Sequence, residues 1–146
     1  MIDKKFIFLV VLAVSLILTS GAVSASTVDM AGIKFNIPDG YEEFENASVN
    51  GEVDEENQII TYTKVYTGGL EDMIIIAVVY PLGNDLTFTL DDILNELDGS
   101  YAKKTINGHE GGFSQQEGNS TFAYVDDNKM IMIMSNNEDL INQVIV

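Results

Sequence analysis

The chain of 146 residues contains no cysteine, no tryptophan and no arginine. The absence of cysteine excludes disulfides, thiolate nucleophiles, thiolate metal sites and a lipid-modified cysteine behind a leader. His109 is the single histidine, so one chain cannot assemble a metal site from two or three histidines. Packing must hold the fold together, and this length with 46% apolar residues suits one domain with its own core.

Positive charge is also scarce, because seven lysines face 23 acidic residues and the formal net charge is -16. Such a surface repels phosphate backbones and anionic headgroups, so we expect no nucleic-acid partner. The acidity suits a soluble monomer or a protein that meets a cationic surface.

The start of the chain has the pattern of a secretory signal peptide. A short basic region (residues 4–5) precedes an apolar run (residues 6–18), and small residues follow up to Ala25. The prediction is a signal peptide over residues 1–25 that is cleaved between Ala25 and Ser26.

An uncleaved amino-terminal anchor is the alternative. The stretch from Phe6 to Val28 carries no charge, and at 1.5 Å rise per residue it just spans roughly 30 Å of hydrocarbon. In both cases residues 26–146 form a single domain outside the cytoplasmic membrane, secreted or at the cell surface. Only an uncleaved leader would place the protein in the membrane.

Periodicity and composition predict the strands of this domain. Alternation over residues 32–37 and the β-branched residues of 58–66 each predict a strand. Residues 73–80 and 130–134 are apolar on both sides, so we expect these strands in the middle of a sheet that is covered on both faces. Residues 41–57 hold seven acids with little periodicity, which predicts a solvated loop or a short irregular turn.

Turn and cap signals complete the expected order of elements. Asn107-Gly108 predicts a β-hairpin, Thr89 is expected to cap a helix that ends at Gly99, and Asn136 to cap a final helix with Asp139 at its third position. The expected fold class is α+β. The sheet, antiparallel or mixed, has about six strands, with one helix after the third strand and a carboxy-terminal helix, and the two helices cover both faces.

Several segments resemble known families. The stretch FNIPDGY (Phe35–Tyr41) resembles the opening of domains of the photosystem oxygen-evolving P-subunit type, and the mid-chain helix, the Ile106–Gly108 turn and the Tyr124–Val144 ending follow in a similar order. The phrases NIPDGY, INGHEG and YVDDNKMIMI also resemble those of small exported archaeal proteins of unknown function. Over residues 30–145 the resemblance implies an α/β/α sandwich and no active-site residues.

No catalytic, cofactor-binding or metal-binding residues are predicted. The serines lack the Gly-x-Ser-x-Gly setting of a nucleophile, and His109 is expected to be an exposed hairpin residue. The acidic runs 54–57 and 126–128 offer oxygen ligands, but neither has the spacing of a calcium-binding loop, so weak calcium binding stays an open hypothesis. Gly111 and Gly112 are expected to permit a bulge or a close backbone approach.

Two further features concern the surface and the core. Asn46 and Asn119 begin acceptor triplets for N-glycosylation in predicted loops. Met130, Met132 and Met134 share one side of a strand, where we expect packing and not soft-metal binding.

The sequence therefore predicts a secreted or cell-surface binding or accessory module without catalytic activity, whose partner is an extracytoplasmic protein or an envelope component. Two alternatives remain open. One is an extracellular hydrolase that uses acidic residues, and the other is a membrane-tethered version with an uncleaved leader.

Overall fold

The computed structural model describes residues 25–69, 71–96 and 100–146. Six strands precede the first described helix: β1 (Ser26–Met30), β2 (Ile33–Ile37), β3 (Glu42–Glu43), β4 (Val49–Asp54), β5 (Ile59–Gly68) and β6 (Asp72–Pro81). A 3-10 turn, η1 (Glu45–Ala47), separates β3 from β4. The remaining elements are α2 (Leu90–Glu96), β7 (Ala102–Ile106), β8 (His109–Gln116), β9 (Asn119–Asp126), β10 (Lys129–Ser135) and α3 (Glu138–Val144).

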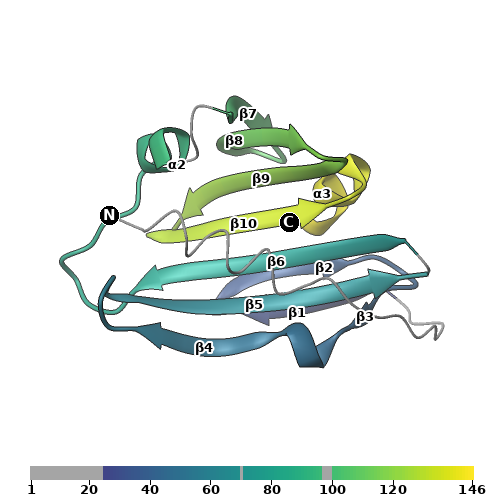
Figure 1. Cartoon of the computed structure of the whole chain (residues 1–146), viewed down its shortest axis with the longest axis horizontal. Helices are drawn as coiled ribbons and strands as arrows, with labels where there is room; N and C mark the ends of the chain where they lie inside the picture. The colour runs from purple at the N-terminus through teal and green to yellow at the C-terminus, as the bar shows by residue number, and fades with distance from the viewer. Residues whose placement is uncertain (1–24, 70, 97–99) are drawn as a thin grey trace.

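One antiparallel sheet forms the centre of the molecule (Figure 1). Its strand order is β3-β5-β6-β10-β9-β8-β7, and β4 also pairs with β5, which makes eight strands. The α+β class is confirmed, but the expected six strands and a helix after the third strand are wrong. Ten strands occur in the described residues, and α2 follows the sixth.

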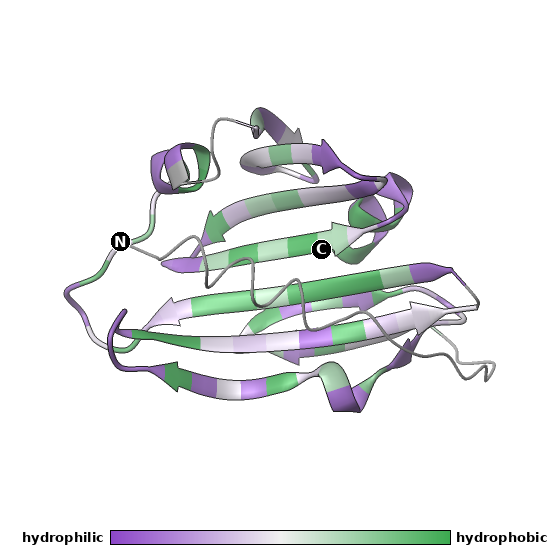
Figure 2. Ribbon diagram, in the orientation of Figure 1, coloured by the Kyte–Doolittle hydropathy of each residue, from purple (hydrophilic) through white to green (hydrophobic). Residues whose placement is uncertain are grey.

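The two strands that are apolar on both sides lie at the middle of the sheet, as predicted. β6 and β10 pair with each other, and in Figure 2 both are mostly hydrophobic along their length. The side chains of a strand alternate between faces, so Ile131 and Met132 point to opposite sides of the sheet. Both are buried, and each face therefore needs its own cover.

The first face, called here the hairpin face, carries Ile74 and Ile131 and is covered by the β1–β2 hairpin together with α3. Phe35 of β2 forms an isolated bridge with Ile145, which joins the hairpin to the end of α3. The amino- and carboxy-terminal segments of the described chain thus close one core together (Figure 1).

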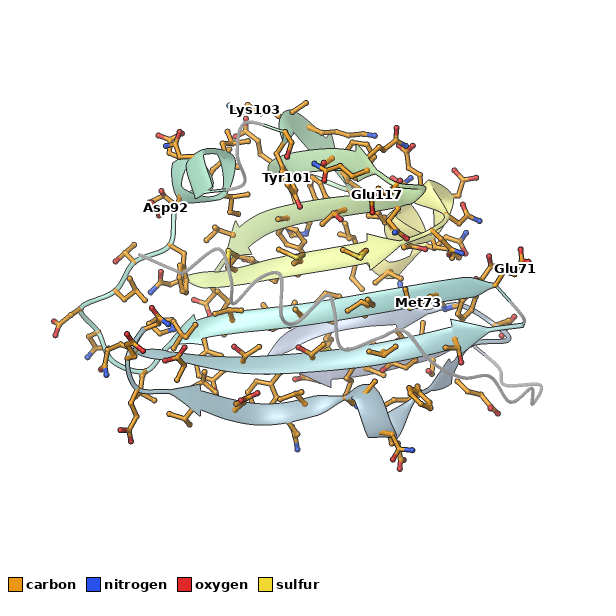
Figure 3. All side chains as sticks on the ribbon, in the orientation of Figure 1. Glu71, Met73, Asp92, Tyr101, Lys103 and Glu117 are labelled. Carbon is orange, nitrogen blue, oxygen red and sulfur yellow. The ribbon has the colours of Figure 1, made fainter. Side chains whose placement is uncertain are left out.

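The cap of α3 lies one residue later than predicted. The side chain of Asn137, not Asn136, accepts a hydrogen bond from the backbone N–H of Asp139 at 3.1 Å. Asn136 instead accepts from the backbone N–H of Met73 at 3.1 Å and donates to the carbonyl of Glu71, at the start of β6 (Figure 3). Asn136 and Asn137 are adjacent, and either one matches the sequence signal for a helix amino cap. Asn137 is the cap because Asn136 bonds to the start of β6.

The second face, called here the α2 face, is covered by α2 and the segment before it. Thr89 caps α2 as predicted: its hydroxyl accepts from the N–H of Asp92, whose carboxylate accepts from the N–H of Thr89 at 2.8 Å. Phe88 and Ile93 pack with Met130 and Met132 in a smaller cluster, which confirms packing as the role of these methionines. The expected end of this helix at Gly99 lies outside the described residues.

The prediction of a solvated loop over residues 41–57 is wrong, because β3, η1 and β4 occupy it. β4 pairs with β5 as the edge of the sheet, with an irregular register between Asn50 and Glu52. None of its side chains is fully buried, so pairing of the backbone and not burial of side chains holds this strand. The opposite edge is β7, which carries Lys103 and Lys104 (Figure 3).

The Asn107-Gly108 turn joins β7 to β8, as predicted. Asn107 adopts φ 49°, a left-handed conformation that asparagine tolerates, and its side chain donates to the carbonyls of Asn142 and Ile145. Gly111 is a close-approach position, because a Cβ there would lie 2.7 Å from the Phe122 ring. The registers on both sides of β8 run without a bulge.

Candidate binding groove

The predicted cleavage position lies at the edge of the described fold. Ala25 and Ser26 are exposed, and β1 begins at Ser26. The backbone N–H of Ala25 donates to the carboxylate of Asp39, in the turn that follows β2. Cleavage between Ala25 and Ser26 would therefore remove no residue of a described strand, and it stays a prediction.

The two glycosylation triplets differ in accessibility. Asn46 is exposed in η1, whereas Asn119 is half-buried as the first residue of β9. The hydroxyl residue of the second triplet, Thr121, is buried, while Ser48 of the first is half-buried and donates to the carbonyl of Phe44 at 3.3 Å. Glycan addition at both asparagines stays a prediction, and Asn46 is the more accessible acceptor.

The single histidine is not a freely exposed hairpin residue as expected. His109 is half-buried, with its ring centroid 4.5 Å from that of Tyr124 and its Nε2 3.3 Å from the carbonyl of Val146. The residue beside it, Glu110, pairs instead with Lys103 at 2.6 Å. The turn residues before His109 are exposed, but the adjacent β9 supplies an aromatic neighbour that the local sequence does not reveal.

The two acidic turns considered for calcium are occupied by internal contacts. The Asp54 carboxylate accepts from the backbone and side-chain N–H groups of Asn57, which lowers the pKa of Asp54. Lys129 donates to Asp127 at 2.8 Å and lowers the pKa of that carboxyl as well. In the described ranges, no group of three or more histidine or acidic side chains could hold a metal ion.

A groove lies between the hairpin and the β4 edge of the sheet. It has a volume of about 390 Å³, within the size range of small-molecule sites. Residues 29–31 of the hairpin turn form one wall, and residues 48–50 and 62–64 of β4 and β5 form the other, with Glu43 and Glu45 between them. Figure 1 shows how these segments, far apart in the sequence, lie side by side.

Charged groups of both signs line this groove. Lys64 donates to Glu43 at 2.7 Å, and both side chains are about 30% exposed. Asp29 is partly engaged, because its carboxylate accepts from the backbone N–H of Gly32 at 2.9 Å and so fixes the hairpin turn. The groove therefore offers an ion pair, a turn-bound carboxylate and the additional carboxylate of Glu45.

Two stacked tyrosines continue the groove across the hairpin face. The rings of Tyr62 and Tyr80 have centroids 5.8 Å apart and planes 14° apart. Their hydroxyl oxygens are 3.5 Å apart, and this hydrogen bond, with burial and the neighbouring phenol, raises the pKa of Tyr80. Tyr62 also lines the groove, so the aromatic surface and the polar groove are continuous.

The amino-acid pattern alone does not predict this groove. Its residues come from three separate segments, and two of them, the hairpin turn and the start of β4, lie in regions where no strand was predicted. The strand predicted over residues 58–66 does place Tyr62 and Lys64 on one face, because the side chains of a strand alternate. That was the single available signal, and it names neither the opposite wall nor the groove.

Comparison with family models, curated proteins and solved structures finds no match for this chain. The resemblance to the photosystem P-subunit fold and to exported archaeal proteins therefore stays a prediction. Among the described residues, no helix is long and apolar enough to cross a membrane.

Proposed function

We propose that the protein is an exported binding module without catalytic activity, and that the groove between the hairpin and the β4 edge holds an extracytoplasmic ligand. The observation that supports this is the groove itself, which combines the aromatic ring of Tyr62 with polar groups from several segments. Ligand sites typically join apolar or aromatic surface with a small number of placed polar groups. The leader predicted from the sequence places such a site outside the cytoplasmic membrane.

The groove gives less support to the hydrolase alternative. A two-carboxylate mechanism needs one acid that is protonated near neutral pH, which requires a raised pKa. Glu43 is paired with Lys64, and Asp29 holds the hairpin turn. Asp54 and Asp127 lie in turns outside the groove. Their pKa values are lowered, whereas a catalytic acid of this kind needs a raised pKa.

Export is tested by recovering the full-length gene product from its own cells and sequencing its amino terminus. We expect the protein outside the cytoplasmic membrane with Ser26 as its first residue. Recovery in the membrane pellet with Met1 retained would support the tethered alternative, and recovery inside the cell would overturn export. The intact mass of the same sample tests Asn46 and Asn119, because the mass of the bare polypeptide would contradict glycan addition.

Binding is tested by sedimenting the processed protein with washed cell envelopes. We expect it to bind, and we expect Asn50→Trp, which fills the groove from β4, to weaken binding by about tenfold. Asn142→Trp is the matched control, because Asn142 is equally exposed but lies on α3 outside the groove. No binding by the wild type, or an equal loss in both variants, would overturn the proposal. Release of soluble products from the envelopes would identify the hydrolase instead.

A further inference from the structure

The chemical class of the ligand follows from the surface next to the groove, and this inference rests on the proposed function. Cross-strand register places Val53, Ile60 and Tyr80 directly opposite one another on the hairpin face. Tyr62 lies two residues further along β5 and therefore on the same face. Val53 is 50% exposed, and Ile60, Tyr62 and Tyr80 are half-buried. A strip of aromatic and aliphatic surface thus runs from the sheet edge into the groove.

The tyrosine rings suit a ligand that has flat apolar surfaces and polar edges. The two nearly parallel rings are large and rigid, and their faces carry partial negative charge. The aliphatic C–H groups on one face of a pyranose ring carry partial positive charge and stack on such faces. Nucleobases stack equally well, but their phosphates would be repelled by a net charge of -16.

The polar groups of the groove match hydroxyls better than they match a cation. A hydroxyl group both donates and accepts hydrogen bonds, so it needs both kinds of partner. The groove supplies a donor in Lys64, acceptors in Glu45 and Asp29, and both functions in the amide of Asn50. A cationic ligand would use the acceptors alone and would leave the donors of Lys64 and Asn50 without a role.

We propose that the groove and the adjoining tyrosine strip bind an uncharged saccharide chain. One sugar ring stacks on the face of Tyr80 that is turned away from Tyr62, and the hydroxyl groups of the sugar that enters the groove bond with Asn50 and Glu45. The strip follows the strand register, so the chain lies across β4, β5 and β6.

The test measures binding of uncharged hexasaccharides, namely maltohexaose, cellohexaose and chitohexaose, to the processed protein by calorimetry and by chemical-shift changes. We expect at least one of them to bind. Tyr80→Ala should weaken that binding by about tenfold, whereas Tyr80→Phe, which keeps the ring, should change it by less than about threefold. Tyr101→Ala is the matched control, because Tyr101 lies at the β7 end of the sheet, away from β4 (Figure 3).

Four outcomes would overturn the inference. They are no binding of any hexasaccharide, equal loss in Tyr80→Ala and Tyr101→Ala, shift changes confined to residues outside the groove and strip, or tetralysine binding with the same dependence on Tyr80. Thermal unfolding of each variant identifies a loss that comes from unfolding, and in that case Tyr80→Leu replaces Tyr80→Ala. If the protein still sediments with envelopes, the proposed function stands although this inference fails.

Discussion

The two faces of the central sheet are closed in different ways. The hairpin face is closed by β1, β2 and α3, which come from opposite ends of the described chain. The α2 face is covered by one contiguous segment, in which Phe88 donates its N–H to the Asn128 side chain at 2.8 Å. The core of the hairpin face therefore needs both ends of the described chain, whereas the cover of the α2 face comes from a single stretch of it.

Adjacent residues of β10 give the largest expected difference between the faces. Ile131 is 0% exposed on the hairpin face, and Met132 is 8% exposed on the α2 face. We expect Ile131→Ala to lower the free energy of unfolding by about 4 kcal/mol and Met132→Ala by about 2 kcal/mol, since surroundings that can collapse reduce the cost of a cavity. Chemical denaturation measures both values. Equal losses would contradict the unequal roles of the faces.

Adjacent glycines of β8 give the second comparison. A Cβ at Gly111 would lie 2.7 Å from the Phe122 ring and would also meet the carbonyl of Ala123, whereas a Cβ at Gly112 would lie 3.2 Å from the side chains of Leu94 and Tyr101. Gly111→Ala should cost about 3 kcal/mol and Gly112→Ala less than about 1 kcal/mol, because side chains give way more easily than backbone. Thermal unfolding tests the order, and a larger loss at Gly112 would contradict it.

Buried hydroxyls give the smallest effects. Tyr66 on the hairpin face and Thr61 on the α2 face have hydroxyl groups with no hydrogen-bond partner among the described residues. Removing an unpaired buried hydroxyl relieves its desolvation cost, so Tyr66→Phe and Thr61→Val should each raise the free energy of unfolding by about 1 kcal/mol. A loss of stability in either variant would show that its hydroxyl has a partner in solution.

Tyr66 also predicts a dependence on alkaline pH. Burial, with the charge of Glu43, raises the pKa of Tyr66 to about 12 from an ordinary value of 10.0. Because the unfolded chain loses this proton at a lower pH than the folded protein, the group leaves the free energy of unfolding unchanged below pH 10 and lowers it as the pH rises from 10 towards 12. Denaturation between pH 9 and 12 should therefore show a smaller decline for Tyr66→Phe than for the wild type, and identical declines would contradict the assignment.

The sequence was most informative where side chains decide the structure. The apolar runs of β6 and β10 place these strands at the centre of the sheet, because only a doubly covered strand is apolar on both sides. The Thr89 and Asp92 pair and the Asn107-Gly108 turn are local signals, and both are confirmed. Each of these features is specified by residues that are close together in the sequence.

The missed elements depend on backbone pairing instead. β4 is an acidic edge strand that is held by its ladder with β5, and none of its side chains is fully buried. β1 was missed because it is short and mostly exposed, and because its turn uses Ala31 in a left-handed conformation, which sequence rules assign to glycine or asparagine. Both elements build the walls of the groove, so the groove could not be predicted without them.

The borders of the large sheet have a consequence for how copies of the protein behave when concentrated. On one flank β7 presents two lysines, and on the other β4 is interrupted at Gly51 and surrounded by carboxylates. Neither flank provides the flat, uncharged template on which strands from neighbouring molecules stack into fibrils. The protein should accordingly stay dispersed even where molecules are crowded together, and remain free to engage other surfaces.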